Sequence, residues 1–449
     1  MNAKLLAFFI SFVFMVSCNP SERKISEDVL ALRMANDEQA VRAAKEAYVF
    51  GYPLVYGKIT ERYMTRGSSD FINKLINYPR ADFKFKNFPY PDPQTYYSCA
   101  WLDVSEGPVL FEIPVSEAKF IIYDAWGNEI LNSSNFDNGV KIIKFALSDK
   151  NWDDILPQDF SNVHLNTGSA FFAYASNIGQ KNIKTYPLNF YGKKYETAKD
   201  LLAKGLPAKS LPDEPPLKQI QNMAIEDFFN ELNFLMLKNK PFQKDAQTLE
   251  DLLDINVAAG MRFEPSSFSN EVLAKIKSIP SDFAKDNAVM KTAWTKIKSL
   301  PQGNAGYYLR AKTAFKNIST ALSSKAVRII SETDSEGEPF DLSKHKYVLH
   351  FEKNQIPQGR WSLTAYDCEG FLIRNRLNRY FLSSLDNLNK NTDGSIDIYI
   401  QQNPPSKDKV SNWLPVSQTS FKLLFKTYLP NASFDEAVFP AVKKKANKS

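Results

Sequence analysis

The region over 19–64 places apolar residues at the spacing of an α-helix. Val41, Ala44 and Tyr48 recur at three- and four-residue steps, which brings them to one face of a helix with about 3.6 residues per turn. Pro53 lies inside the same pattern. Because proline lacks the backbone N–H that a helix interior needs, we expect the helix to be kinked or divided there.

Two longer regions alternate apolar and polar positions with the two-residue period of β-strands. Short strand-like segments separated by Gly, Asn, Asp and Pro fill 65–180 and 326–443, a pattern typical of antiparallel sheets. Between them, 181–325 starts as a proline-rich linker and then shows helical periodicity. The lysine-rich residues 444–449 are expected to form a basic tail.

The same skeleton occurs once in each β region, at 113–135 and at 356–378. Both copies read Ile-Pro, then Tyr-Asp, then Gly, Ile and two Asn at the same spacing. Apolar residues before Tyr-Asp and after Gly predict a hairpin in which Asp124 and Asp367 cap the turn. Chance recurrence of turn-rich hairpins is the alternative, but agreement at Tyr, Asp and both Asn favours an internal duplication.

These patterns together predict an α+β, β-rich fold. Two related antiparallel β-sandwich units of jelly-roll type are separated by an all-helical insert and preceded by an N-terminal helix. The chain of 449 residues is long enough for two or three domains.

Residues 1–18 have the features of a bacterial lipoprotein signal peptide. Lys4 precedes an apolar run that ends at Val16, and Cys18 follows where a cleavage site belongs. The run is shorter than the roughly 20 residues that a membrane-spanning helix needs. We therefore expect a lipidated Cys18 that anchors the protein in the bacterial cell envelope, on the periplasmic or outer-membrane side. An ordinary signal peptide with a chance cysteine is the alternative.

The composition narrows the expected partners. The formal net charge is +6, and the sequence shows no basic stripe interleaved with aromatic residues, so we do not expect a nucleic-acid partner. Besides Cys18, the chain contains Cys99 and Cys368. We expect both to be buried as small apolar groups, with a single disulfide between them as the alternative.

The sequence lacks the motifs of common catalytic and cofactor sites. The segment "NKNTDGSIDIYI" at 389–400 is similar to a calcium-binding loop, but Ile400 stands where a bidentate Glu is required, so we expect a plain turn. Three histidines are too few for a multi-histidine zinc site. Neither a Gly-x-Ser-x-Gly elbow nor a phosphate-binding glycine-rich loop occurs. We expect no metal and no cofactor.

Several spaced motifs occur in the order typical of one family. They are "PQTYYS" and "AWLDVSEGPVLFEIP" in the first half and "RWSLTAYDCEGFLIRNRLNRY", "NTDGSIDIYIQ" and "NWLP" in the second. With them the chain resembles the bacterial proteins built from domains of unknown function 1254 and 1214. The resemblance implies a secreted protein with a β-sandwich, helical, β-sandwich layout and brings no established reaction. Where the family reads Pro-Asn-Asn-Asp-Thr, this chain reads "PDPQT", so Asp92 and Gln94 replace the Asn and the Asp.

Aromatic residues near the two hairpins, with the polar groups beside them, are the candidates for a ligand site. Such residues stack on sugars or fill the cores of β-sandwiches, and core packing is the alternative for each. The candidate ligand-binding residues are Tyr97, Trp101, Asp103, His350, Trp361, Arg379, Asn412 and Trp413. If a pocket exists, we expect it near Arg379 and Asn412.

The sequence favours a cell-envelope lipoprotein that binds a small-molecule or glycan ligand, or a partner, through its twin β units. A hydrolase acting on an envelope or glycan substrate is the alternative. The hydrolase requires two carboxylates, or a histidine with an acid, facing one cleft. Finding Asp103, Asp367 or His350 buried in turns and strand ladders would weaken the hydrolase hypothesis.

Overall fold

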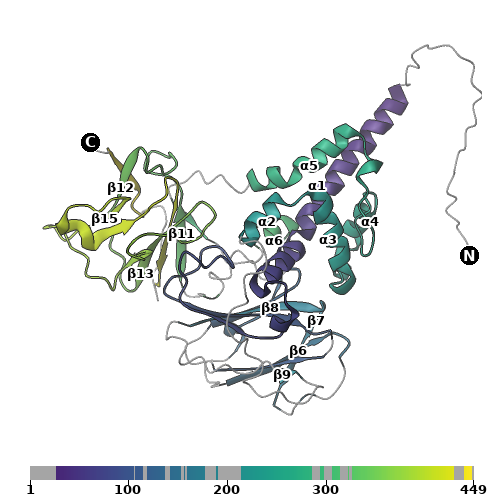
Figure 1. The fold of residues 1–449 in the computed structure, drawn as a ribbon, viewed down its shortest axis with the longest axis horizontal. Helices are drawn as coiled ribbons and strands as arrows, with labels where there is room; N and C mark the ends of the chain where they lie inside the picture. The colour runs from purple at the N-terminus through teal and green to yellow at the C-terminus, as the bar shows by residue number, and fades with distance from the viewer. Residues whose placement is uncertain are drawn as a thin grey trace, which may run out of the picture.

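The computed structural model describes residues 27–105, 107–114, 119–136, 142–152, 156, 159–176, 189–190, 214–285, 294–297, 306–313, 322, 326–428 and 439–446. A group of helices, a first β unit below it and a second β unit beside them make up the molecule (Figure 1). The predicted signal peptide, including Cys18, lies outside the described residues. The predicted fold class, two β units separated by a helical segment and preceded by a helix, is confirmed.

Helix α1 (Glu27–Thr65) is the centre of the helical group. It contacts α2 (Pro216–Asn222), α3 (Ile225–Lys238), α4 (Ala246–Leu253), α5 (Asn270–Lys285) and α6 (Tyr307–Thr313). Pro53 does not divide the helix, which continues past it. Burial of Leu54 and Val55 contributes about 1.5–3 kcal/mol each, which offsets the roughly 3 kcal/mol that an interior proline costs.

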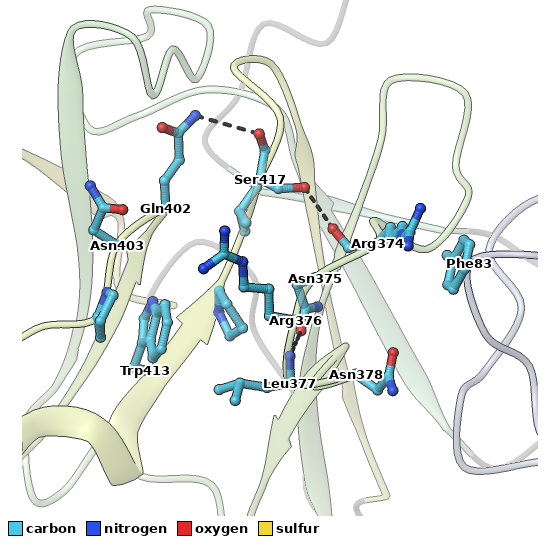
Figure 2. A pocket seen from close by; sticks show the side chains of 13 residues that line it. Phe83, Arg374, Asn375, Arg376, Leu377, Asn378, Gln402, Asn403, Trp413 and Ser417 are labelled. Atoms are coloured by element: carbon cyan, nitrogen blue, oxygen red, sulfur yellow. Dashed lines mark hydrogen bonds between the residues drawn. The ribbon is translucent and has the colours of Figure 1, made fainter.

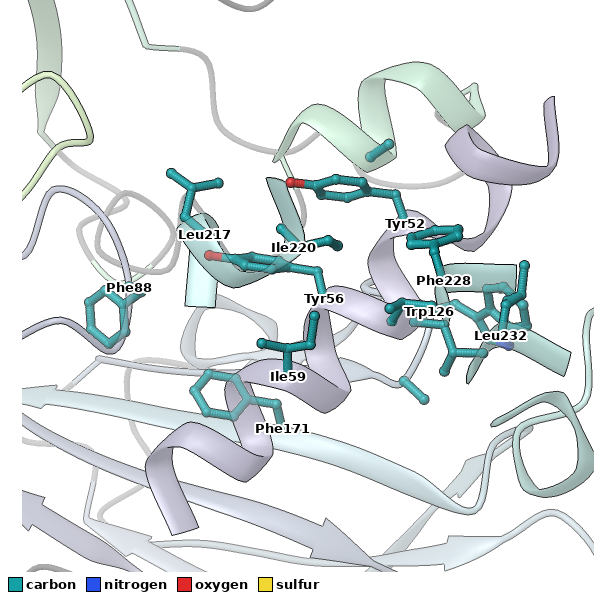
Figure 3. Close-up of a cluster of buried hydrophobic side chains, with 14 of the residues drawn as sticks. Tyr52, Tyr56, Ile59, Phe88, Trp126, Phe171, Leu217, Ile220, Phe228 and Leu232 are labelled. Atoms are coloured by element: carbon teal, nitrogen blue, oxygen red, sulfur yellow. The ribbon is translucent and has the colours of Figure 1, made fainter. Parts of the chain in front are cut away.

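The middle of α1 is buried on every side rather than on one stripe. Tyr52 and Tyr56 lie against the helices, and Ile59 lies close to Phe171 of the first β unit (Figure 3). Gly51 allows this close packing, because a Cβ there would lie 2.4 Å from Leu232 Cδ2 of α3. A helix that is apolar all round belongs in the interior of a protein, and α1 joins the insert to the first β unit in one core.

The first β unit consists of two packed sheets. One sheet has the strand order β1 (Ile76–Tyr78), β2 (Tyr96–Asp103), β8 (Ser169–Ser176), β4 (Lys119–Asp124), β5 (Glu129–Asn132). The other sheet has the strand order β7 (Ser161–Leu165), β6 (Ile142–Asp149), β3 (Val109–Pro114), β9 (Asn189–Phe190). Phe111, Phe145 and Phe172 fill the space between the sheets. The other face of the first sheet packs on the helical group, so β2, β4 and β8 are buried on both faces.

The second β unit repeats this arrangement strand for strand. One of its sheets has the strand order β10 (Thr295–Lys296), β11 (Val327–Ser331), β17 (Lys422–Thr427), β13 (Trp361–Tyr366), β14 (Phe381–Ser383). The other has the strand order β16 (Trp413–Pro415), β15 (Ile396–Gln401), β12 (His345–Phe351), β18 (Val442–Ala446). Thus β1 corresponds to β10, β2 to β11, and so on to β9 and β18. Even the parallel pair recurs, β6 with β7 and β15 with β16. The common topology supports an internal duplication.

The repeated Asp-x-x-Gly motif forms the same turn in both units. The side chain of Asp124 accepts a hydrogen bond at 2.8 Å from the backbone N–H four residues later, and Asp367 accepts the same bond at 2.8 Å. The turn glycines, Gly127 and Gly370, have φ of +74° and +89°, which glycine adopts without steric cost. The predicted capping role of both aspartates is confirmed.

Strands occur in two regions where the sequence predicts none. The region 181–325 does not consist of a linker and helices alone, because β9 pairs with β3 of the first unit and β10 pairs with β11 of the second. The expected basic tail 444–449 is also wrong in part, because β18 extends to Ala446 and pairs with β12. Backbone pairing at a sheet edge does not depend on apolar side chains, and edge strands often carry lysine.

The two cysteines have different environments. Cys99 lies in the buried part of β2, as expected, whereas Cys368 is exposed and the two are unpaired. Cys368 follows Asp367 in the Asp-x-x-Gly turn, and the middle positions of such turns face solvent. The expectation of burial is therefore wrong for Cys368, and the two cysteines form no disulfide.

Substitution of Gly370 by alanine is expected to destabilise the protein by more than about 1 kcal/mol, because its φ is positive. The new Cβ would also lie 3.0 Å from Tyr90 Cζ. Thermal and urea unfolding of Gly370→Ala test this expectation. Gly337→Ala is the control, since φ is +83° there and nothing lies within 4 Å of the new Cβ; equal losses in both variants would exclude a contribution from the Tyr90 contact.

Candidate functional site

The candidate aromatic residues of β2 do not reach a cleft. Tyr97 and Trp101 share the face of the sheet that packs on the helical group. The Tyr97 hydroxyl accepts a hydrogen bond from the backbone N–H of Asp92 at 2.9 Å, and Trp101 Nε1 donates to Met64 Sδ at 3.3 Å. Both side chains therefore serve the core.

The two candidate acid–base residues are also occupied. Asp103 forms an ion pair with Lys238 at the end of α3. His350 lies on β12, where Nδ1 is 2.7 Å from Asp397 Oδ1 and Nε2 is 3.2 Å from Glu352 Oε1. Hydrogen bonding to Asp397 raises the pKa of His350 above 6.5. Together with the turn role of Asp367, this places all three residues in structural contacts, and each of the three is partly exposed rather than buried.

Of the remaining candidates, Trp361 and Trp413 each line a cavity, whereas Arg379 and Asn412 form structural hydrogen bonds. Trp361 lines a cavity between the β units, described below. Arg379 is a structural residue, because Nη1 donates to the carbonyls of Val410 and Trp413 at 2.8 and 3.0 Å. Asn412 is buried, and its side chain holds the backbone of neighbouring loops. Trp413 lines a pocket on the second β unit.

That pocket, called the arginine pocket here, has a volume of about 760 Å³. It is lined by Phe83, Arg374, Asn375, Arg376, Leu377, Asn378, Gln402, Asn403, Pro404, Trp413, Pro415, Val416 and Ser417. Trp413 and Pro415 are buried and apolar, and the Arg376 side chain extends towards Trp413 (Figure 2). The pocket lies where the sequence indicated, but its two arginines were not among the candidates.

Local hydrogen bonds fix the loop that carries both arginines. The Asn375 side chain accepts from the backbone N–H groups of Leu377 and Arg379 at 3.2 and 3.0 Å and donates to the Arg379 carbonyl at 2.9 Å. Ser417 Oγ donates to the Arg374 carbonyl at 2.6 Å. Asn375 belongs to the repeated motif, so the duplicated turn supports the pocket wall.

The lining of the arginine pocket favours binding of an anion that also carries hydroxyl groups. It contains Arg374 and Arg376 but no aspartate, glutamate or histidine. Neither arginine forms an ion pair with a residue that the structure describes, although Arg374 lies 5.3 Å from the Phe83 ring centroid. Arginine recognises carboxylate and phosphate through paired hydrogen bonds, and the surrounding amides offer both donors and acceptors.

The second cavity, called the junction cavity here, has a volume of about 350 Å³. At its base Asp92, from the loop before β2, forms an ion pair with Lys426 of β17. Burial alone would raise the pKa of Asp92, but Lys426 and Arg328 hold it below 3.8. The same loop is held to the second unit by Tyr366, whose hydroxyl donates to the Pro91 carbonyl at 2.9 Å. The polar groups at this junction mainly connect the two units.

The described residues show no group of three or more His, Cys, Asp or Glu that could hold a metal ion. The segment 389–400 forms a turn in which Ser395 donates to Asp393 through its N–H and its hydroxyl at 2.9 and 2.6 Å. Among the described helices, none is long and apolar enough to cross a membrane.

Two family models match the chain, each described as a protein of unknown function. DUF1254 matches residues 72–185 and DUF1214 matches residues 325–432. These ranges cover the strands of the two β units up to β8 and from β11 to β17. The resemblance noted from the motifs is thereby confirmed. The comparison with curated proteins found no match.

The solved structures that resemble the chain include two uncharacterised bacterial proteins. The crystal structure of the VPA0106 protein from Vibrio parahaemolyticus superposes with a TM-score of 0.52 at 19% identity, covering 90% of this chain and 100% of that one. An uncharacterized protein from Burkholderia cenocepacia superposes with a TM-score of 0.39 at 10% identity, covering 93% and 95%. The first of these shares the fold with the chain.

Proposed function

Since this chain belongs to the family of proteins that join an N-terminal DUF1254 domain to a C-terminal DUF1214 domain, we propose a function from its own pockets. It is a cell-envelope lipoprotein, anchored through Cys18, that binds an envelope ligand in the arginine pocket. The observation that carries this proposal is a pocket of about 760 Å³ with two arginines and no acidic or histidine side chain in its lining. Its volume is in the range of small-molecule sites.

The membrane partner follows from the start of the sequence. The apolar run that ends at Val16 and the cysteine at position 18 support a lipid anchor on the periplasmic or outer-membrane side. Only eight residues separate Cys18 from residue 27, where α1 begins, so the helical group would lie near the membrane. The β units would then extend into the aqueous compartment.

A hydrolase is the weaker alternative. The junction cavity does contain two carboxylates, Asp92 and Asp386, which are the residue types that glycoside hydrolysis uses. Asp92 is held in the ion pair with Lys426, and Asp386 accepts hydrogen bonds from the Ser383 N–H and hydroxyl at 2.7 and 3.1 Å. Both carboxylates are thus committed to the structure, which leaves binding as the better-supported function.

Substitution of Arg376 by glutamine is expected to weaken binding of acidic glycans by about 10- to 100-fold. The loss of hydrogen bonds to a charged group costs about 1.5–3 kcal/mol, and about 1.4 kcal/mol corresponds to a tenfold change in affinity. A panel of acidic and neutral bacterial envelope glycans, measured by titration calorimetry, tests this. Arg376 is exposed, so the fold should be retained.

The matched control is Arg360→Gln, which removes an exposed arginine from the junction cavity. It should leave the affinity unchanged. Equal losses in both variants, or equal binding of neutral and acidic glycans, would contradict a specific anion site in the arginine pocket.

A further inference from the structure

Next to the arginine pocket lies a second hollow on the same β unit. This lysine groove has a volume of about 650 Å³ and is lined by Lys346, Val348, Tyr399, Gln401, Pro404, Pro405, Ser406, Lys409 and Lys445. Pro404 lines both hollows. The two sites are therefore neighbours, separated by the loop after β15.

The lysine groove is also cationic without an acidic side chain in its lining. Within the described part of the chain, Lys346, Lys409 and Lys445 form no ion pair, and Lys409 Nζ lies 5.2 Å from the centre of the Tyr399 ring. Two acids lie beside the groove. Asp397 accepts a hydrogen bond from the Tyr399 hydroxyl at 3.3 Å and interacts with His350, and Asp408 interacts electrostatically with Lys409 and Tyr399. Burial and Asp397 raise the pKa of Tyr399 to about 12, so its hydroxyl remains a donor.

Strand β18 determines which lysines enter this groove. Side chains alternate between the two faces of a strand. Lys444 forms an ion pair with Glu336, whereas Lys445 lines the groove and pairs in register with Lys346 of β12. The part of the basic C-terminus that forms β18 thus becomes an ordered wall of a binding surface.

We propose that the ligand of this protein is a linear polyanionic glycan that occupies the arginine pocket and the lysine groove together, crossing the loop at Pro404. This inference rests on the proposed function and deepens it by naming the ligand class. Five cationic side chains line the two hollows without a carboxylate, so a ligand with repeated negative charges fits better than a single anion. Phe83 in the arginine pocket and Tyr399 in the lysine groove supply partly exposed aromatic rings, on which sugar rings can stack.

The shape of the two hollows favours a polymeric ligand over a membrane surface. The cations line concave sites of about 760 and 650 Å³, which a slender polymer can enter and a flat membrane surface cannot. Binding at two linked sites makes the second contact intramolecular, so affinity should rise with chain length. It should also fall with added salt, because the cations are near the surface.

The test uses the full chain in detergent and galacturonate oligomers of one, two, four and eight units, with galactose oligomers as neutral controls. The octamer is expected to bind at least tenfold more tightly than the monomer. In the variant with Lys346, Lys409 and Lys445 changed to glutamine, monomer binding should persist and the length-dependent gain should disappear. Arg376→Gln should weaken binding of both the monomer and the octamer.

A second triple variant, with Lys275, Lys277 and Lys285 of α5 changed to glutamine, carries the same change in net charge. It should retain the length-dependent gain, which separates the groove from general attraction. Glycerol phosphate oligomers of equal charge carry no sugar ring. A length-dependent gain with galacturonate supports the proposal, whereas a gain with glycerol phosphate alone would overturn the glycan assignment.

Monomer binding that depends on Arg376, without tighter binding of the octamer, would overturn the extended site and leave the proposed function intact. Absence of binding by every anionic oligomer would overturn both the extended site and the proposed function. If the groove variant changes binding to vesicles of anionic lipid but not to oligomers, the lysine groove is a membrane contact and the glycan inference fails.

Discussion

Substitution of Asp92 by alanine is expected to lower the free energy of unfolding by about 3–5 kcal/mol, because it leaves a buried ammonium group without its partner. Asp92 and Lys426 are 7% and 6% exposed, so the ammonium group would be poorly solvated without the carboxylate. Arg328 lies close enough to Asp92 to lower its pKa, and the variant would leave this second cation facing Lys426. Urea unfolding followed by circular dichroism measures the loss.

Two further variants separate the ion pair from other effects. Lys426→Met and the double variant Asp92→Ala with Lys426→Met complete a double-mutant cycle, in which the double variant should cost less than the sum of the single ones. Asp103→Ala breaks an aspartate–lysine pair whose side chains are 33% and 43% exposed, and should cost less than about 1 kcal/mol. A loss of that size at Asp92 would mean that the junction pair is not effectively buried.

The stability contribution of Asp124 is expected to decrease as the pH rises. Burial raises the pKa of Asp124 to about 6, so the folded state binds a proton that the unfolded chain, with a pKa near 3.8, has already released. Stability therefore falls between about pH 4 and pH 6 and is constant above that range. A difference of about two pKa units corresponds to about 3 kcal/mol.

Asp124→Asn removes this dependence, because asparagine does not titrate. The difference in unfolding free energy between the wild type and the variant should change by about 3 kcal/mol between pH 4 and pH 7, and other titrating groups cancel in that difference. Asp367→Asn is the matched control from the second copy of the turn, since Asp367 makes the same turn hydrogen bond but lies 3.7 Å from Lys86 near the surface. A flat difference for Asp124→Asn would show that its carboxylate is solvated.

The repeated turn was predictable because its information is local. Asp367 and Gly370 stand three residues apart, and their hydrogen bonds close within the same hairpin. The repeated motif also indicated that the two β units are related, and both units do have the same strand order. Contacts that join distant segments left no comparable pattern: the ion pair between Asp92 and Lys426 spans 334 positions.

The aromatic candidates were misplaced for a different reason. An alternating strand pattern identifies two faces but not which face meets another part of the protein. Trp101 was read as a possible ligand contact, yet its face of β2 packs on α1. The arginine pocket combines Phe83, Arg374, Gln402 and Trp413, from four separate stretches, and an exposed arginine carries no sequence signal until the fold brings such stretches together.

The central position of α1 has a consequence for how the protein reaches its folded state. The helix is synthesised first, but its middle is apolar on all sides, and its helical partners start only at Pro216, after the strands β1–β9. A nascent chain that ends before Pro216 would expose this surface and be prone to aggregation. Folding of the helical group can therefore finish only after the insert has been synthesised, and for the lipoprotein proposed here such a delay would leave the chain unfolded during export.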